Sequence, residues 1–458
     1  MMIRGMKIRG KISGKKIIVL AIVIVVAVFI AFNLISGYQK TLPVIDYKHY
    51  TGIGAAADYP DAKFAVISDL HFYDKSLGTG GAAFEEVLYS DRKLLLETEE
   101  LLDYATAELL DADLDFVLVS GDMTKDGELI NHEQVAARLQ KLIAAGIKVF
   151  VVPGNHDVNN PDAVRFIGDG KAPVENVSPE TFAKIYRNMG YGDAVYSDEY
   201  LDYVAEPVDG LWIVGINSCR SDENVPGESE IVGGKLSQEQ EEWLAGVLGE
   251  AVSKNKAVII LTHHGLIEHW DGQSKLHPDY LIEDYKHVGA FLASYNVRLG
   301  FTGHYHALDA VLAEFGGSGL YDIETGSLAT APCPIRYCRI SGGVLTVRTD
   351  TIVDRLFPGT DFADSANQFV KNTVVLEAYK TLKKYKASDK DADYIADTVG
   401  DAFVAHYSGD EDPDLRPEFD TGKLGLWGRI IFSTQKYALD GLWADLAPPD
   451  NNFSVSLN

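Results

Sequence analysis

The stretch Val149-Phe-Val-Val-Pro-Gly-Asn-His-Asp157 combines a short apolar run with an abrupt change to polar residues. Three valines and a phenylalanine, followed by Pro and Gly, are typical of a fully buried strand. Asn155, His156 and Asp157, which can bind a metal ion or move a proton, come directly after it. Sites in open α/β sheets form outside the carboxyl ends of the strands, so this stretch predicts both a strand and part of a site.

Four other apolar runs end in the same way. Two carry carboxylates, Phe64-Ala-Val-Ile-Ser-Asp-Leu-His71 and Phe116-Val-Leu-Val-Ser-Gly-Asp122, and two carry histidine pairs, Val258-Ile-Ile-Leu-Thr-His-His264 and Leu299-Gly-Phe-Thr-Gly-His-Tyr-His306. Strand ends that share one edge would bring these distant side chains together. Nitrogen and oxygen donors without a thiolate suit Zn, Mn or Fe rather than a structural zinc site built from cysteines.

The spacing of the polar residues predicts a site for two ions. Asp69 and His71 lie two residues apart, as do His304 and His306. Side chains at i and i+2 of an extended strand point the same way, so two such pairs could chelate one ion and leave donors for a second. Asp122 follows a glycine and could reach between them. Two ions about 3.5–4 Å apart can clamp the attacking and leaving oxygens of an in-line displacement.

Amphipathic stretches alternate with the apolar runs between residues 63 and 350. Leucines at helical spacing predict helices over 91–110, 131–145 and 236–254. Strands that alternate with helices indicate an α/β layer fold.

Two long loops, 72–90 and 158–180, follow the first and third groups of polar residues. Loops of this length either line a site and help to select its substrate, or they are surface insertions only.

The sequence pattern changes after about residue 355. Helical patterns cover 363–387, 390–407 and 422–445, separated by acidic and proline-containing linkers. We therefore predict a helical C-terminal domain over 355–458, which would be either a structural cap or a module that binds a partner.

The amino terminus predicts a membrane anchor. A basic segment, residues 1–16, precedes an apolar run over 17–36 whose one strongly polar residue is Asn33. About 20 helical residues match the thickness of a bilayer's hydrocarbon core. The cations in front of this run predict a cytoplasmic amino terminus and a single span, with the rest of the chain outside the cell membrane on a tether, 37–60. A cleaved signal peptide is the alternative, although no clean Ala-x-Ala site follows.

The chain is acidic, with a formal net charge of −26 over 458 residues. Residues 1–40 contain Lys and Arg but no Asp or Glu, so the acidic excess lies entirely beyond them. This argues against nucleic acid bound over the general surface. An anionic substrate would need local positive charge, which bound metal ions supply.

The motifs together resemble the calcineurin-like metallophosphoesterase superfamily. Five of them occur in order across residues 63–306: Asp69-x-His71, Gly121-Asp122, Gly154-Asn155-His156-Asp157, His263-His264 and Gly303-His304-x-His306. Gly121-Asp-Met-Thr-Lys-Asp-Gly127 further resembles the phosphodiesterase branch, and the whole chain resembles bacterial members that are anchored or exported. The resemblance implies a four-layer α-β-β-α sandwich as the catalytic domain over 61–354, with the helical domain added.

The resemblance also implies a role for each motif residue. Two divalent or trivalent ions, Mn, Fe or Zn, would be bound, the first by Asp69, His71 and His306 and the second by Asn155, His263 and His304, with Asp122 bridging both. A metal-bridging hydroxide would attack phosphorus. His156 would protonate the departing alkoxide, and Asp157 would orient that imidazole.

The other histidines leave alternatives open. The pair His263-His264 departs from a common family form in which two prolines follow, so either could be the ligand, and motif position favours His263. We expect His269 and His277 in loop or surface positions, and His132 on a helix face or behind a ligand.

The leading hypothesis is a phosphodiesterase that acts on a small phosphodiester or a wall polymer. A phosphomonoesterase or nucleotide pyrophosphatase would use the same metal site. A non-catalytic surface protein, stabilised by its metals, is a third reading, but it would not need the proton donor His156. The sequence predicts no particular oligomeric state.

Overall fold

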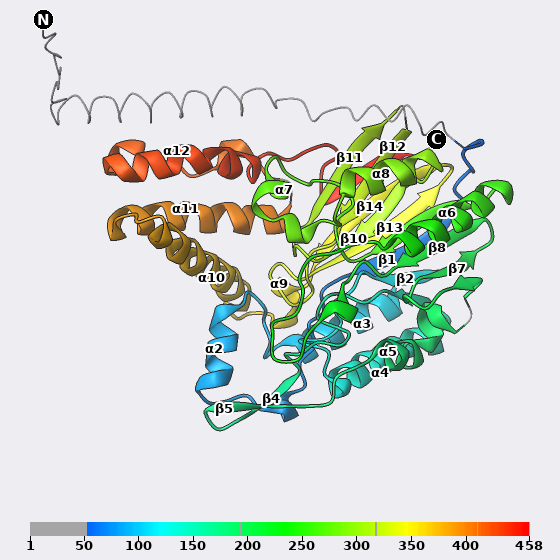
Figure 1. Cartoon of the computed structure of the whole chain (residues 1–458), viewed down its shortest axis with the longest axis horizontal. Coiled ribbons are helices and arrows are strands. Elements are labelled where there is room, and N and C mark those ends of the chain that lie inside the picture. The colour runs from blue at the N-terminus through cyan, green and yellow to red at the C-terminus, as the bar shows by residue number, and fades with distance from the viewer. Residues whose placement is uncertain (1–52, 193, 317, 410, 458) are drawn as a thin grey trace, which may run out of the picture. The chain divides into compact units, whose positions relative to one another are not determined.

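The structure, a computed structural model, describes residues 53–457 apart from 193, 317 and 410 (Figure 1). The predicted basic segment, membrane anchor and most of the tether lie outside these residues. Within the described part of the chain, no helix is both long and apolar enough to cross a membrane.

One mixed sheet of six strands contains the first three predicted runs. Its order is β15 (Asn452–Ser456), β14 (Val344–Thr351), β13 (Pro334–Ser341), β1 (Ala62–Ile67), β2 (Phe116–Val119) and β3 (Lys148–Val151). The strands β1, β2 and β3 are parallel, whereas β13 pairs antiparallel with β1. The parallel strands are buried on both faces, which explains their continuous apolar sequences.

A second mixed sheet of seven strands contains the other two runs. Its order is β11 (Asp309–Phe315), β12 (Ser318–Glu324), β10 (Leu299–Thr302), β9 (Ala257–Thr262), β8 (Leu211–Ile216), β7 (Tyr203–Val208) and β6 (Tyr196–Ser197). Neighbours from β8 to β12 across the middle of the sheet are parallel, and both edges are antiparallel.

The two sheets pack face to face through aromatic side chains. The ring of Phe64 on β1 stacks on that of Phe116 at 4.7 Å and meets Phe301 of β10 edge-on at 5.5 Å. All three side chains are fully buried. This contact holds the ends of strands from different sheets close to one another.

Helices cover the outer face of each sheet (Figure 1). The first sheet shares a core with α3 (Thr98–Asp111) and α4 (Leu129–Ala144). The second shares one with α6 (Gln238–Ser253) and α8 (Tyr285–Ser294). The α/β class with two mixed sheets is therefore confirmed.

Both predicted long loops contain regular structure. The segment 72–90 includes η1 (Lys75–Leu77) and α2 (Ala82–Ser90), and 158–180 includes the hairpin β4 (Val164–Ile167) and β5 (Gly170–Pro173). The two segments pack on each other through a small apolar cluster, in which the rings of Phe84 and Phe166 lie 5.2 Å apart. Together they form one packed unit rather than two independent loops, and their role in selecting a substrate stays a prediction.

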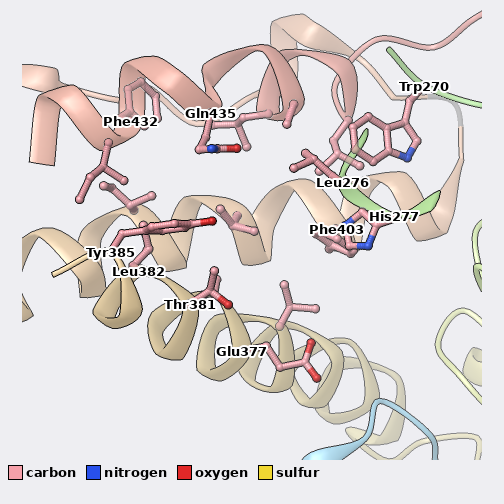
Figure 2. A pocket seen from close by; sticks show the side chains of 18 of the residues that line it. Trp270, Leu276, His277, Glu377, Thr381, Leu382, Tyr385, Phe403, Phe432 and Gln435 are labelled. Carbon is pink, nitrogen blue, oxygen red and sulfur yellow. The ribbon is translucent and has the colours of Figure 1, made fainter. Parts of the chain in front are cut away.

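The C-terminal helices are present as predicted. They are α9 (Val353–Leu356), α10 (Phe362–Lys384), α11 (Asp389–Ser408) and α12 (Leu426–Gly441). The last three surround a cavity together with the segment around Trp270 and His277 (Figure 2). Strand β15, which the sequence did not predict, follows them and pairs with β14 of the first sheet. The domain boundary near residue 355 stays a prediction.

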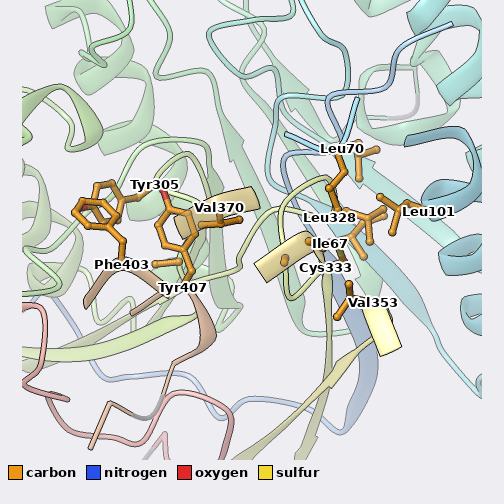
Figure 3. Packing of buried hydrophobic residues seen from close by; sticks show 14 of the residues in the cluster. Ile67, Leu70, Leu101, Tyr305, Leu328, Cys333, Val353, Val370, Phe403 and Tyr407 are labelled. Carbon is orange, nitrogen blue, oxygen red and sulfur yellow. The ribbon is translucent and has the colours of Figure 1, made fainter. Parts of the chain in front are cut away.

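One apolar cluster joins these helices to the α/β part. Tyr305, just beyond β10, lies 6.3 Å from the ring of Phe403 and 6.3 Å from that of Tyr407, both on α11 (Figure 3). All three are buried. Because Tyr305 stands between His304 and His306 in sequence, α11 packs directly behind two candidate ligands.

The remaining elements are short. They are α5 (Pro179–Ile185), η2 (Arg187–Tyr191), η3 (Ser221–Glu223), α7 (Gln273–Leu276), η4 (Pro278–Tyr280), η5 (Pro413–Leu415) and η6 (Thr421–Lys423).

Candidate metal centre

All seven predicted metal-binding residues lie just beyond the carboxyl ends of five strands, and the structure brings them together. Asp69 and His71 follow β1, Asp122 follows β2, Asn155 follows β3, His263 follows β9, and His304 and His306 follow β10. Each is buried, and none is more than 8% exposed.

The first group contains Asp69, His71 and His306, whose donor atoms lie within 4.8 Å of one another. The Nε2 atoms of His71 and His306 are 3.1 Å apart. Oδ1 of Asp69 lies 3.4 Å from Nε2 of His306 and 3.8 Å from Nε2 of His71. Three donors thus face one point.

The second group contains Asp122, His263 and His304. Nε2 of His263 lies 3.2 Å from Oδ1 of Asn155 and 3.4 Å from Oδ2 of Asp122. Nε2 of His304 lies 3.2 Å from the carbonyl oxygen of Asp279, to which it can donate a hydrogen bond. That contact leaves Nδ1 of His304 as the nitrogen available to a metal.

Asp122 faces both groups. Its Oδ2 atom is 3.6 Å from Nε2 of His71, in the first group, and 3.4 Å from Nε2 of His263, in the second. This is the position that a bridging carboxylate needs.

The donor set fits transition-metal ions. Two donors on one ion, each about 2.1 Å from it, lie about 2.9–3.4 Å apart in octahedral or tetrahedral geometry. The separation of the His71 and His306 nitrogens, 3.1 Å, and that of His263 from Oδ1 of Asn155, 3.2 Å, fall in that range. Oδ1 of Asp69 is buried and accepts no hydrogen bond from the described residues. A buried carboxylate oxygen without a partner is costly unless a cation satisfies it.

The charge states of the histidines also suit metal binding. Burial, followed by the ammonium of Lys93, lowers the pKa of His71 well below its ordinary value, and burial likewise lowers the pKa of His306. Burial lowers the pKa of His263 too, but the Asp122 carboxylate outweighs it and raises that pKa to about 9. Ligands must be deprotonated, so binding at His263 would release a proton.

Backbone conformation marks the same residues. Five candidate ligands have left-handed φ angles between 40° and 76°, namely Asp69, His71, Asp122, His304 and His306. Non-glycine residues adopt this region rarely, and such strain clusters at functional sites. Neighbouring glycines permit the close approach: a Cβ on Gly154 would lie 2.0 Å from Oδ1 of Asp122.

The predicted proton donor His156 stands beside both groups, but its partner is Asp126, not Asp157. Nδ1 of His156 lies 2.9 Å from Oδ1 of Asp126, whereas Nε2 lies 4.0 Å from Oδ2 of Asp122. The predicted orienting role of Asp157 is therefore wrong, because consecutive side chains in this turn point in different directions.

Asp157 instead fixes the backbone around the site. Its carboxylate accepts hydrogen bonds from the amides of Gly154, Met123 and Thr124, at 2.9, 3.1 and 3.0 Å, and from the Thr124 hydroxyl at 2.9 Å. The residue ties the turn after β3 to the turn after β2. Burial and the charge of Asp122 raise its pKa to about 7, against the effect of these hydrogen bonds.

A cationic residue that the sequence did not indicate also reaches the site. Nζ of Lys93 lies 3.4 Å from Nε2 of His156 and 3.0 Å from Oδ2 of Asp91. Burial and Lys93 lower the pKa of His156, but Asp122 and Asp126 raise it, to about 9 overall. The two carboxylates thus favour the protonated imidazole, and its Nε2 lies toward the two groups.

The structure distinguishes the two adjacent histidines. Both ring nitrogens of His264 are engaged, Nδ1 with the Ser218 hydroxyl at 2.7 Å and Nε2 with the Val232 carbonyl oxygen at 2.8 Å. Among the described residues, His263 has one such contact outside the site, between Nδ1 and the Ser120 carbonyl oxygen at 2.8 Å. The geometry favours His263 as the ligand.

The remaining histidines lie apart from the donor groups. Nε2 of His132 lies 2.8 Å from the carbonyl oxygen of Asp157, so it supports the site from behind. His277 lines the cavity of Figure 2. His269 is fully buried, with Nδ1 3.1 Å from Oδ1 of Asp309 and Nε2 3.2 Å from Oδ2 of Asp322. His269 lies in a loop, one of the two predicted alternatives, but it belongs to a buried ion network and not to the surface.

Comparisons with known proteins agree with this arrangement. The family model for calcineurin-like phosphoesterases matches residues 62–308. The uncharacterized metallophosphoesterase-like protein YydB of Bacillus subtilis (strain 168) is 26% identical over 261 residues, which are 51% of this chain and 50% of that protein. The match thus spans about half the length of this relative.

Two solved structures are also similar. A dimetal phosphatase from Danio rerio has a TM-score of 0.46 and 17% identity, and the match covers 64% of this chain and 97% of that one. The purple acid phosphatase PPD1 from yellow lupin (Lupinus luteus) seeds has a TM-score of 0.37 and 12% identity, with 65% and 52% covered.

Proposed function

The chain belongs to the calcineurin-like phosphoesterase family, and from this membership we propose that it is a dinuclear metal-dependent phosphodiesterase. One observation carries the proposal: Oδ2 of Asp122 faces both donor groups, while Nε2 of His156 stands 4.0 Å from the same oxygen. A site that served stability alone would not need an imidazole beside the carboxylate that its two metal ions would share.

Asp69, His71 and His306 would hold one ion, and Asn155, His263 and His304 the other, with Asp122 shared. Such ions supply Lewis-acid polarisation of the phosphoryl group and a water nucleophile at neutral pH. The protein's own contribution is to place these donors rigidly in a buried site.

His156 has the position and charge of a general acid. Asp126 accepts a hydrogen bond from Nδ1–H and so directs the Nε2 proton toward the donor groups. That proton would pass to the departing alkoxide oxygen, which is a poor leaving group without it. Lys93, 3.4 Å from Nε2, adds positive charge that suits an anionic phosphoester.

Two features favour a diester over a monoester. The segment Gly121–Gly127, which supplies Asp122 and Asp126, has the form of the phosphodiesterase branch. In addition, Oε1 of Glu230 lies 4.0 Å from Nε2 of His156. A carboxylate at this place disfavours the second negative charge of a monoester more than the single charge of a diester.

The location of the enzyme is a separate proposal that rests on residues 1–36 alone. A basic segment before an apolar run would anchor the chain in the cell membrane with the metal centre outside. Its substrate would then be a small phosphodiester or a wall polymer that is present at the outer face.

The test is metal removal and replacement with paired substrates. The full chain is stripped with a chelator, Mn, Zn or Fe is added back, and rates on bis- and mono-nitrophenyl phosphate are compared. We expect two bound ions and a higher kcat/KM on the diester. A clear preference for the monoester would leave a phosphomonoesterase with the same site. Two bound ions without activity on either substrate would favour a non-catalytic binding protein.

A further inference from the structure

A cavity of about 580 Å³ lies between the C-terminal helices and the α/β part, in the size range of small-molecule sites (Figure 2). Helices α10, α11 and α12 form three of its sides, and the segment from Trp270 to Tyr280, together with Tyr305, forms the fourth.

The lining of this cavity is mainly aliphatic and aromatic. Its apolar members include Leu382, Val399, Phe403, Phe432, Leu439 and Trp270. Polar groups come from Arg92, His277, Glu377, Thr381, Gln435 and the tyrosine hydroxyls. Along the aliphatic side chains of the helices, a sugar or nucleoside would lose hydrogen bonds to water without replacement, at a cost for each unpaired polar group. An alkyl or acyl chain loses none, and its burial is favourable.

Two series of side-chain contacts connect the wall of the cavity to the candidate metal centre. The ring of Tyr280 in its wall lies 4.6 Å from the ring of His304. Arg92 in its wall lies over the ring of Tyr407 at 5.9 Å, and that ring is 6.5 Å from His306. Both contacts end at candidate ligands, one in each donor group.

Charge is concentrated where the cavity meets the centre. Arg92 lines the cavity, and the next residue, Lys93, reaches His156 at 3.4 Å. An amphipathic phosphoester could therefore place its anionic group between these cations and the metal ions, with its apolar part among the helices.

We propose that the cavity binds the alkyl or acyl chain of the substrate, so that the enzyme acts on a phosphodiester with one hydrophobic chain. This inference rests on the proposed function and names the substrate class of the same site. The occupant is part of the substrate rather than a separate ligand, because the wall residue Tyr280 packs on the ring of His304, and Arg92 connects to His306 through the ring of Tyr407.

The test uses nitrophenyl phosphodiesters whose second ester group lengthens from methyl to octyl. In each, water forms the new bond to phosphorus and nitrophenolate leaves, so only the chain differs. We expect kcat/KM for the full chain to rise by up to about fourfold per methylene that enters the cavity.

Variants identify the cavity as the cause. Thr381 on α10 and Gln435 on α12 line it from facing helices and are exposed, so Thr381→Trp and Gln435→Trp fill space with little risk to folding. Both should flatten the dependence on chain length and leave the methyl ester's rate unchanged. Lys380→Trp, on an exposed residue of α10 outside the lining, is the matched control and should keep the wild-type rise.

The outcomes separate the two proposals. If the wild type hydrolyses the methyl ester but its kcat/KM does not change with chain length, this inference is overturned and the proposed function remains. No hydrolysis of any ester overturns the proposed function. Calorimetry with octyl phosphate then decides the inference: binding that Thr381→Trp abolishes supports the cavity site, and equal or absent binding in the two proteins rejects it.

Discussion

Oδ1 of Asp126 lies 2.9 Å from Nδ1 of His156, while Nε2 of the same ring faces the bridging carboxylate of Asp122. This arrangement fixes both the orientation and the protonation of the imidazole. The two carboxylates outweigh burial and Lys93 and bring the pKa of His156 to about 9, which favours the protonated ring.

Removal of the imidazole should affect substrates according to their leaving groups. His156→Ala is expected to slow hydrolysis of an unactivated alkyl diester by about 10²–10⁴-fold, because its alkoxide must be protonated as it departs. A nitrophenyl diester, whose leaving group needs no proton, should lose much less. Steady-state rates on both substrates measure this, and an equal loss would show that His156 is not the proton donor.

Replacement of the partner carboxylate should change the pH profile. Asp126→Asn removes one cause of the raised pKa of His156, so that pKa falls. Because the protonated ring is the active form, the rate on an alkyl diester should decline at a pH lower than in the wild type, by about one unit or more. If the rate declines at the same high pH in both proteins, the result would argue against the pairing of Asp126 with His156.

Asp157→Asn is the informative contrast, since it alters the neighbouring residue in sequence. An amide cannot accept all the hydrogen bonds from Gly154, Met123 and Thr124, so thermal unfolding should show a loss of about 1–3 kcal/mol. The rate should decline at the same high pH as in the wild type, because Asp157 does not contact the imidazole. A decline at a different pH in this variant would restore the orienting role to Asp157.

The adjacent histidines should differ in metal content. His263→Ala removes a donor that faces Asp122 and Asn155, so the purified protein should retain about one ion instead of two. His264→Ala should keep both ions and lose stability, because Ser218 and Val232 lose their partner. Elemental analysis beside thermal unfolding separates these results. The reverse pattern would make His264 the ligand.

A buried ion pair should make the attachment of α11 dependent on pH. Nδ1 of His406 contacts Glu411 and lies 3.9 Å from Oδ2 of Asp309. Burial lowers the pKa of His406, but these carboxylates raise it above the ordinary value. The pair therefore contributes its full stability below the unfolded-state pKa and loses it as pH rises through the folded-state pKa.

Accordingly, His406→Gln should cost about 3–5 kcal/mol of unfolding free energy at a pH below the ordinary histidine pKa, and the difference from wild type should shrink as the pH rises through the raised pKa of His406. Denaturant unfolding of both proteins at several pH values provides the measurement. A difference that stays constant or grows with pH would contradict the account of this ion pair.

The strands and the candidate ligands could be predicted because their signals are local. Buried parallel strands require continuous apolar runs, and polar residues at their carboxyl ends have one edge at which to meet. The segment 116–122 shows both features in seven residues. Short β15 gave no such signal, because its pairing with β14 depends on a chain return over about 100 residues.

Other features depended on contacts that sequence does not encode locally. Leu94 and Leu95 continued the helical spacing of the predicted helix 91–110, yet α3 begins at Thr98. Both leucines are buried in an irregular segment, where the Leu94 amide bonds the Ala329 carbonyl. That segment carries Lys93 into the site. Similarly, Asp126 lies 30 residues from His156, and only the folded turn brings them together.

Anomalous diffraction from crystals grown with excess Mn²⁺ tests the central claim most directly, because it locates ions independently of activity. We expect two peaks about 3.5–4 Å apart, with Asp122 bound to both. One ion would flank His71 and His306, and the other His263 and His304. A single ion, or two ions that share no carboxylate, would contradict the dinuclear site on which the proposed chemistry depends.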